Sequence, residues 1–150
     1  MLNNIFIMLN KDTLENYQAA HQIEWANTLP EGCPPENILI PENEEFYRLT
    51  IEPDKVTEDD FKTYVELCPQ KTFKGQLAIF ATGLSVLSSD NPQGLLKLPG
   101  MEKFKGVAKL TLTPKDGVMM KSGGKPYHYT WWRTTAFDIQ SAVIINNEDA

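Results

Sequence analysis

The sequence predicts a single α+β domain, with a mostly antiparallel sheet of about five to seven strands and two helices in the N-terminal half. The helices are expected early because Asp12 and Thr57 each stand three residues before an acidic side chain, the pattern of a helix-capping box. Strands are expected later because residues 107–113 alternate between apolar and polar side chains and are followed by a turn-forming Pro-Lys-Asp-Gly.

The composition suits one soluble domain that spans residues 1–150. Hydrophobic residues make up 41% of the chain and charged residues 23%, which is ordinary for a globular protein and disfavours disorder. The formal net charge of −6 disfavours nucleic-acid binding, because phosphate repels an acidic surface. No stretch approaches the ~20 apolar residues of a membrane span, and no signal-peptide pattern is found. We therefore expect a cytoplasmic protein that does not bind membranes.

The sequence shows no motif for a metal or a cofactor. Cys33 and Cys68 lack the spacing of a zinc site, and a domain of this size does not need a disulfide, so both are expected to be free thiols. Neither of the two histidines has an acidic residue at metal-binding spacing. Glycine-rich phosphate loops and the common hydrolase motifs are missing as well.

The first part of the chain is predicted to contain a short apolar segment, a helix and a long loop. Residues 5–9 are apolar on both faces, as in a buried strand or a short anchoring segment. Asp12 has the features of an N-cap, so a helix is expected over residues 13–27. Residues 29–45 hold four of the ten prolines and form an irregular loop, interrupted only by the apolar residues 38–40.

A strand over residues 45–51 and a helix over residues 57–67 are predicted next. The strand contains Arg48 among apolar and hydroxyl side chains. The helix begins at the Thr57 capping box and ends before Pro69. Its apolar side chains recur at spacings of three and four, the pattern of a helix face that is buried in the core. These side chains are Phe61, Tyr64, Val65 and Cys68.

Residues 77–87 are predicted to form the central strand of the sheet, because they are apolar on both faces. Gly83 within this strand indicates a bulge or the close approach of a ligand or of backbone. Residues 107–113 form the next strand, residues 118–121 return antiparallel to it, and residues 139–145 form the last strand. The core side chains expected from these strands are Leu77, Ile79, Phe80, Leu84, Val86, Leu110 and Leu112.

The most informative segment is the aromatic stretch at residues 125–133, which holds two of the three tryptophans. In a strand, alternation places Tyr127, Tyr129, Trp131 and Arg133 on one face, and His128, Thr130 and Trp132 on the other. If one face is core and the other is exposed, Trp131 and Trp132 differ sharply in exposure. The first face then offers a platform for a small planar ligand or for a protein partner.

Arg48 and His128 are the candidate polar site residues, because each is a lone polar side chain in an otherwise apolar strand. Arg48 can supply a fork for a carboxylate or a phosphate, or it can snorkel at a sheet edge. His128 can act in a site, or it can be a half-buried histidine bonded to backbone. We expect both residues near one cleft that satisfies them together.

One arrangement of residues resembles a known family. Arg48 in Phe-Tyr-Arg-Leu, Ser85 in Thr-Gly-Leu-Ser-Val and the late aromatic strand follow the order seen in small ADP-ribosyltransferase-like domains. The resemblance implies that Arg48 and Ser85 hold NAD. The family's third motif, a late Glu that acts on the ribose, is not matched here, and Gln140 or His128 would have to serve.

The sequence therefore predicts a small acidic binding or interaction protein that contacts a protein partner or a small planar ligand through residues 127–133. The binding residues are expected to be Tyr127, Tyr129, Trp131 and Arg133. The alternative function is ADP-ribosyltransferase-like or other nucleotide-linked transfer, with catalytic candidates Arg48, Ser85 and His128. Convergence of these three side chains on one pocket favours the enzyme, and an exposed tryptophan favours the interaction protein.

Overall fold

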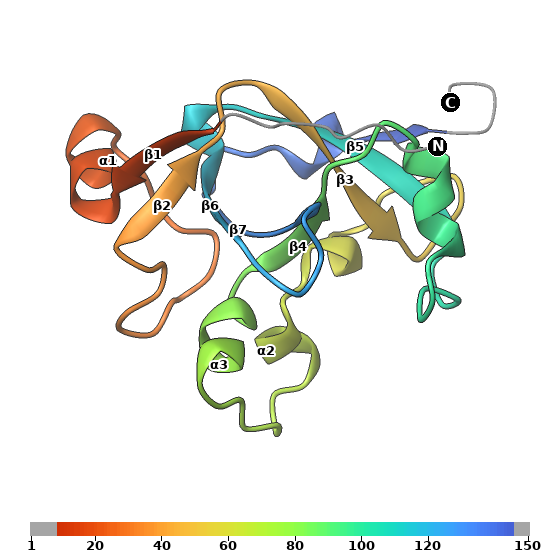
Figure 1. Ribbon diagram of the computed structural model, residues 1–150, viewed down its shortest axis with the longest axis horizontal. Helices are drawn as coiled ribbons and strands as arrows, with labels where there is room; N and C mark the ends of the chain where they lie inside the picture. Colours follow the sequence, from red (N-terminus) through yellow and green to blue (C-terminus); the bar gives the residue numbers. More distant parts are fainter. Residues whose placement is uncertain (1–8, 146–150) are drawn as a thin grey trace.

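The structure is a computed structural model that describes residues 9–145. Its strands form one antiparallel sheet of eight, in the order β1-β2-β6-β7-β4-β3-β5-β8. Figure 1 shows that the sheet is strongly curved, and that α2 and α3 lie together at a different side of the molecule from α1. The strands are β1 (Asn10–Thr13), β2 (Asn37–Ile40), β3 (Glu44–Thr50), β4 (Leu84–Leu87), β5 (Gly106–Leu112), β6 (Gly117–Lys121), β7 (His128–Arg133) and β8 (Val143–Ile145).

The helices are short. The predicted mixture of helix with an antiparallel sheet is confirmed, but the sheet has eight strands rather than five to seven. The helices are shorter than expected, and α3 lies outside the N-terminal half of the chain. The extent of a single domain over residues 1–150 stays a prediction. The α-helices are α1 (Leu14–Ala20), α2 (Tyr64–Leu67) and α3 (Gln76–Phe80), and the 3-10 helices are η1 (Glu58–Phe61), η2 (Pro92–Lys97), η3 (Pro114–Asp116) and η4 (Ile139–Ser141).

One face of the sheet, here called the Phe46 face, carries the largest core cluster. Phe46 is paired with Leu110 across β3 and β5, and Val86 with Tyr129 across β4 and β7. Antiparallel partners point to the same face, and the pairing of Tyr47 with Leu87 places all four side chains together. The buried cluster on this face is Phe46, Phe61, Leu84, Val86, Leu110, Leu112, Met119, Tyr129, Trp131 and Phe137.

The opposite face, here called the Trp132 face, carries two separate clusters. At one end Trp132 packs with Tyr17 of α1 and with side chains of α3. At the other end Leu87 packs with Leu95 of η2. The register places Ser85 beside Thr130 between these clusters, so a polar strip divides this face.

Residues 77–87 do not form one strand, and the prediction of a long central strand is wrong. Only Leu84–Leu87 join the sheet, whereas Gln76–Phe80 are helical. The Thr82 hydroxyl donates to the carbonyl of Ile79 (2.6 Å) and so satisfies the C-terminal end of α3. A Cβ added at Gly83 would lie 2.5 Å from the Thr130 methyl carbon and 3.1 Å from the carbonyl oxygen of Trp131, so backbone does approach Gly83 closely. An apolar run alone does not distinguish a strand from a packed helix.

The core side chains predicted in the strands are buried, whereas those predicted in the segment that forms α3 are not. Leu84, Val86, Leu110 and Leu112 are all buried. Leu77 is 67% exposed, because it lies on the outward side of α3. Ile79 and Phe80 on the same helix are half-buried against the Trp132 cluster.

The first helix is half as long as predicted. Its N-cap is Thr13, whose hydroxyl accepts the Asn16 N–H (3.1 Å), rather than Asp12. The helix stops at Ala20 and the chain becomes extended, so that the Thr135 N–H donates to the carbonyl of Glu24 (2.8 Å). Backbone pairing with the residues at the end of β7 therefore replaces helix in the second half of the predicted segment.

The predicted helix over residues 57–67 is two separate turns. Thr57 and Asp60 form the expected capping box around η1, but Thr63 and Glu66 form a second one that starts α2. Thr63 takes an extended backbone conformation, so η1 does not continue into α2. Of the expected core stripe only Phe61 is buried, and the stripe over Tyr64, Val65 and Cys68 is exposed.

β6 does not return alongside β5, and the predicted hairpin is wrong. The turn η3 leads the chain across the sheet, where β6 lies between β2 and β7 while β5 lies between β3 and β8. The last strand is confirmed only over Val143–Ile145, since residues 139–141 form η4. Of the predicted apolar segment 5–9, residues 5–8 lie outside the described residues.

Candidate functional site

The aromatic residues of β7 are core rather than surface. Trp131, Trp132 and Tyr129 are 0%, 1% and 5% exposed. β7 lies between β4 and β6, and clusters cover both of its faces. Trp131 Nε1 donates to the carbonyl of Asp116 (3.1 Å), and Trp132 Nε1 donates to the Thr82 hydroxyl (2.9 Å). The prediction that the two tryptophans differ in exposure is therefore wrong, and no exposed aromatic platform forms there.

The two ends of the predicted binding face remain accessible. Tyr127 is half-buried, lies just before β7, and packs against the cluster that contains Leu87. Arg133, the last residue of β7, is also half-buried. Tyr129 and Trp131, the middle of that face, are closed to a partner. Of the four residues, Arg133 is the one that lines an open cleft.

Arg48 has a structural role, because its guanidinium is bonded to backbone carbonyls. On the Phe46 face its Nε donates to the carbonyl of Asp60, and one terminal nitrogen donates to the carbonyl of Ser85 (2.6 Å). Burial lowers the pKa of Arg48 to about 10, while the Asp60 carboxylate opposes this shift. The guanidinium is therefore still charged at neutral pH and joins β3, β4 and η1. It does not present a free fork to a ligand.

His128 and Ser85 lie on the Trp132 face, across the sheet from Arg48. The register pairs Leu87 with His128 and Ser85 with Thr130, whereas Tyr47, the neighbour of Arg48, is paired with Leu87. The prediction of a cleft shared by Arg48 and His128 is wrong for this reason. The site implied by the transferase resemblance is therefore not assembled.

His128 belongs to a small polar network on the Trp132 face. Its Nδ1 lies 2.9 Å from the Ser122 hydroxyl, which lies 2.8 Å from the Thr130 hydroxyl. Burial lowers the pKa of His128, so the ring is neutral at neutral pH. Ser122 is buried, at 7% exposure, so a substrate does not reach its hydroxyl. The network fills the polar strip of the sheet and is structural.

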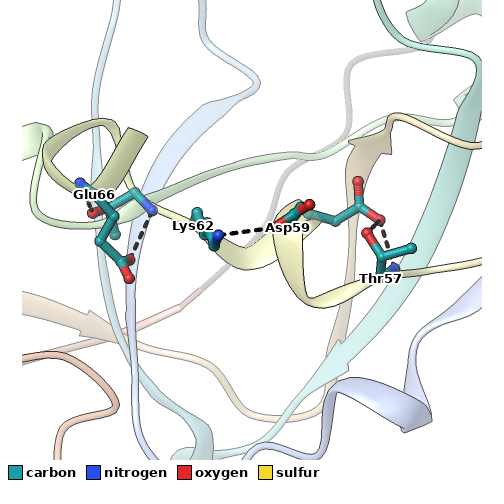
Figure 2. Close-up of polar contacts among 6 residues, drawn as sticks. Thr57, Asp59, Lys62 and Glu66 are labelled. Carbon is teal, nitrogen blue, oxygen red and sulfur yellow. Dashed lines mark hydrogen bonds and ion pairs between the residues drawn. The ribbon is translucent and has the colours of Figure 1, made fainter. Parts of the chain in front are cut away.

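A cleft of about 590 Å³ opens between the η1–α2 segment and the chain that follows β7. Phe61 and Phe137 form its apolar floor, with ring centroids 5.9 Å apart. Lys62 stands on one wall and pairs with Asp59 (2.9 Å), as Figure 2 shows. The residues that line the cleft are Glu58, Phe61, Lys62, Glu66, Arg133, Thr135, Ala136, Phe137, Asp138 and Ile139.

Arg133 is the incompletely satisfied group of this cleft. Its Nε is buried and has no hydrogen-bond partner among the described residues. Its guanidinium carbon lies 5.8 Å from the Phe61 ring centroid. Burial lowers the pKa of Arg133 and the nearby Glu66 carboxylate raises it. A buried donor without an acceptor costs about 1–3 kcal/mol, and because this nitrogen is closed to solvent it is also closed to a ligand.

A second surface feature is the lobe formed by residues 62–80, which contains α2, α3 and the loop between them. Four large apolar side chains of the lobe are more than 40% exposed. The described residues contain six such exposed side chains, and the other two are Ile51 and Val143. Figure 1 shows α2 and α3 side by side at the edge of the molecule. The four side chains are Tyr64, Val65, Leu67 and Leu77, here called the lobe surface.

The sequence analysis predicts neither the cleft nor the lobe surface. It assigns the apolar stripe of residues 57–67 to the core, because a stripe at helical spacing is usually buried. The signal that could have found the lobe is the second Thr-x-x-Glu at Thr63 and Glu66, which starts a new helix and turns its stripe outward.

Comparison with family models, with curated proteins and with solved structures finds no match for this chain. Among residues 9–145, no three His, Cys, Asp or Glu side chains are grouped so as to hold a metal ion. Within the same part of the chain, no helix is long and apolar enough to cross a membrane. The lobe surface and the cleft that Arg133 lines are the two candidate binding surfaces of the described residues.

Proposed function

We propose that this chain is a small binding protein that docks a protein partner through the lobe surface. The observation that carries the proposal is the clustering of exposed apolar residues, with Tyr64 54%, Leu67 53% and Leu77 67% exposed. Single exposed apolar side chains are normal, but a contiguous group marks an interaction site. The proposal keeps the interaction class expected from the sequence and moves the contact surface from β7 to the lobe.

The lobe surface is built in advance of binding. The Val65 N–H donates to the carbonyl of Ala81 (3.2 Å) and holds α2 against the end of α3. The Thr63–Glu66 capping box fixes the start of α2, with Glu66 Oε1 accepting the Thr63 N–H at 3.0 Å. A partner therefore meets two ordered helices, which reduces the entropy lost on binding.

The charge of the lobe indicates the chemistry of the partner. Residues 62–80 contain three lysines and one glutamate, in a chain whose formal net charge is −6. Lys71 Nζ lies 5.3 Å from the Phe73 ring centroid, so one positive charge of the lobe is held over an aromatic side chain. A partner with an apolar patch surrounded by acidic side chains matches both properties, and it is steered to the lobe rather than to the acidic remainder of the chain.

The test begins with a photo-crosslinking amino acid at position 77, used in a lysate of the organism that encodes the chain. A protein captured there is then purified, and its affinity is measured by calorimetry. We expect Leu67→Ser and Leu77→Ser each to weaken binding at least about tenfold, because hot-spot side chains each contribute more than 1 kcal/mol. Reversing Lys71 and Lys74 to Glu should also weaken binding and remove most of its salt dependence.

Ile51→Ser is the matched control, because Ile51 is an exposed apolar residue (47%) outside the lobe, and it should leave the affinity unchanged. Three results overturn the proposal. The first is an affinity for the captured protein that the lobe substitutions do not change. The second is concentration-dependent self-association that Leu77→Ser abolishes. The third is binding to anionic vesicles that depends on Lys71 and Lys74.

A further inference from the structure

We propose that residues 69–75 are a processing site for an endopeptidase that cleaves after lysine, and that the cut chain stays assembled. This site goes beyond the docking function of the lobe and does not depend on it. Cleavage breaks one peptide bond and consumes one water, whose hydroxyl joins the lysine carbonyl carbon and whose proton joins the released nitrogen. The bonds concerned are Lys71–Thr72 and Lys74–Gly75.

The segment lies in the longest exposed stretch of the described residues. Every residue from 64 to 77 is exposed except Phe73, whereas the next longest exposed run is residues 51–55. Within residues 69–75 only the Lys71 N–H donates a hydrogen bond to another described residue, to the carbonyl of Cys68 (3.0 Å). A protease binds its substrate as an extended chain, so this segment enters an active site without breaking the fold. Figure 1 shows it as the loop between α2 and α3, at the outer end of the lobe.

The basic residues elsewhere in the chain are protected at the bond that would be cleaved. The chain has fourteen lysines and arginines, and all of them lie among the described residues. Only Lys71, Lys74 and Lys125 are followed by an exposed residue. Lys125 precedes Pro126, which has no N–H and a fixed φ, and proteases of this class do not cleave such a bond. Each of the others precedes a buried or half-buried residue, so cleavage there requires the fold to open.

The charges around the two lysines suit an enzyme with an acidic pocket for lysine. No Asp or Glu lies between Glu66 and Asp90 in the sequence. A protease pocket that holds lysine does so through a carboxylate, and further carboxylates beside the lysine are repelled from it. Lys55 provides the contrast, because it is exposed but lies between Asp54 and Val56, and Val56 packs against the buried cluster of the Phe46 face.

The cut would separate two halves that the sheet holds together. The first half contributes β1, β2 and β3, and the second contributes β4 to β8. β3 lies between β4 and β5 and is paired with β5 from Glu44 to Thr50, and β2 lies beside β6. Within the lobe, the Val65 N–H donates to the carbonyl of Ala81 (3.2 Å) across the cut. The two halves can therefore part only if the sheet unfolds.

The test begins with limited proteolysis of the full native chain by trypsin, which cleaves after both lysine and arginine. We expect the first cleavage after Lys71 or Lys74, at least about 100-fold faster than after any other basic residue, because the other bonds require the fold to open. Mass spectrometry of the quenched mixture assigns each bond. Gel filtration without denaturant should give one peak at the size of the intact chain, and denaturing electrophoresis should separate two fragments.

A double variant and a control sharpen the result. Lys71→Gln combined with Lys74→Gln should slow the first cleavage at least about 100-fold, with an unchanged circular dichroism spectrum. Lys55→Gln should leave the cleavage pattern unchanged. In the organism that encodes the chain, peptides that end at Lys71 or begin at Gly75 should be found without added protease.

Three results overturn the proposal. The first is an initial cleavage after any basic residue other than Lys71 and Lys74. The second is a pair of fragments that part in gel filtration without denaturant. The third is recovery of only the uncut chain from the organism that encodes it. Loss of lobe docking leaves all of these outcomes unaffected.

Discussion

β7 and α2 carry similar side chains and place them in opposite environments. Trp131 and Trp132 of β7 are at most 1% exposed, whereas Tyr64 and Leu67 of α2 are more than half exposed. β7 is bonded to a strand on each side and covered on both faces. α2 has only four residues and packs one side against the end of α3. The neighbours of an element, more than its own residues, therefore decide whether an aromatic side chain is buried or exposed.

The largest effect expected from this comparison is on stability in β7. Trp131→Ala should lower the free energy of unfolding by about 3–5 kcal/mol, since it empties a fully buried site. Leu77→Ala in the lobe should change it by no more than about 0.5 kcal/mol, because the side chain is already in solvent. Urea denaturation of both variants measures the difference. Equal losses in the free energy of unfolding would contradict the assignment of Trp131 to the core and Leu77 to the surface.

The second expected effect is at Arg48, which ties the sheet to the segment leading into the lobe. Arg48→Met should lower the free energy of unfolding by about 3 kcal/mol, because the carbonyls of Asp60 and Ser85 both lose a charged donor. Lys109→Met, which removes a single surface ion pair with Glu45, should cost about 0.5 kcal/mol or less. A loss below about 1 kcal/mol for Arg48→Met would contradict its structural role.

The third effect is smaller and local to the lobe. Thr63→Ala removes the capping hydroxyl of α2 and should lower the free energy of unfolding by about 1 kcal/mol. Hydrogen exchange should speed up at the amides of residues 65–68 and remain unchanged in β7. Thr72→Ala, in the exposed loop of the lobe, is the control and should change neither quantity. Faster exchange in β7 as well would mean that the lobe and the sheet open together.

The smallest effect concerns pH and reports on the Trp132 face of β7. Burial lowers the pKa of His128, so the unfolded chain takes up the proton at a higher pH than the native chain does. The contribution of His128 to the free energy of unfolding is complete above its ordinary pKa of 6.5. It is lost as the pH falls from 6.5 through the lower pKa of the native state. His128→Gln should flatten the fall in stability between about pH 7 and pH 5, and the loss of slope should be seen below the ordinary value of 6.5. A slope that His128→Gln does not change would contradict the assignment.

The sequence predicts the sheet better than the helices, and the residues explain why. Two predicted strand segments, residues 107–113 with their alternating pattern and the apolar residues 84–87, do form strands in the sheet. Residues 77–80 are equally apolar but precede Thr82, whose hydroxyl ends a helix. Local hydrogen bonds of this kind decide short helices, and hydrophobic periodicity does not report them.

The candidate site was predicted only in one residue, Arg133. Its neighbours in the cleft come from residues 58–66 and 135–139, which no periodic pattern connects to β7. Arg48 and His128 are both single polar side chains in apolar strands, and each found its partners on its own side of the sheet. A sequence shows that such a group needs a partner, but the register of the sheet decides which face supplies it.

The two capping boxes have a consequence for how this chain can change over time. Thr57 with Asp60, and Thr63 with Glu66, fix the path into the lobe by contacts only three residues apart. The side chains of the lobe surface, Tyr64, Val65, Leu67 and Leu77, take no part in those contacts. Substitutions among them should therefore be nearly neutral for folding, so the apolar surface of the lobe can change in sequence while the sheet stays unchanged.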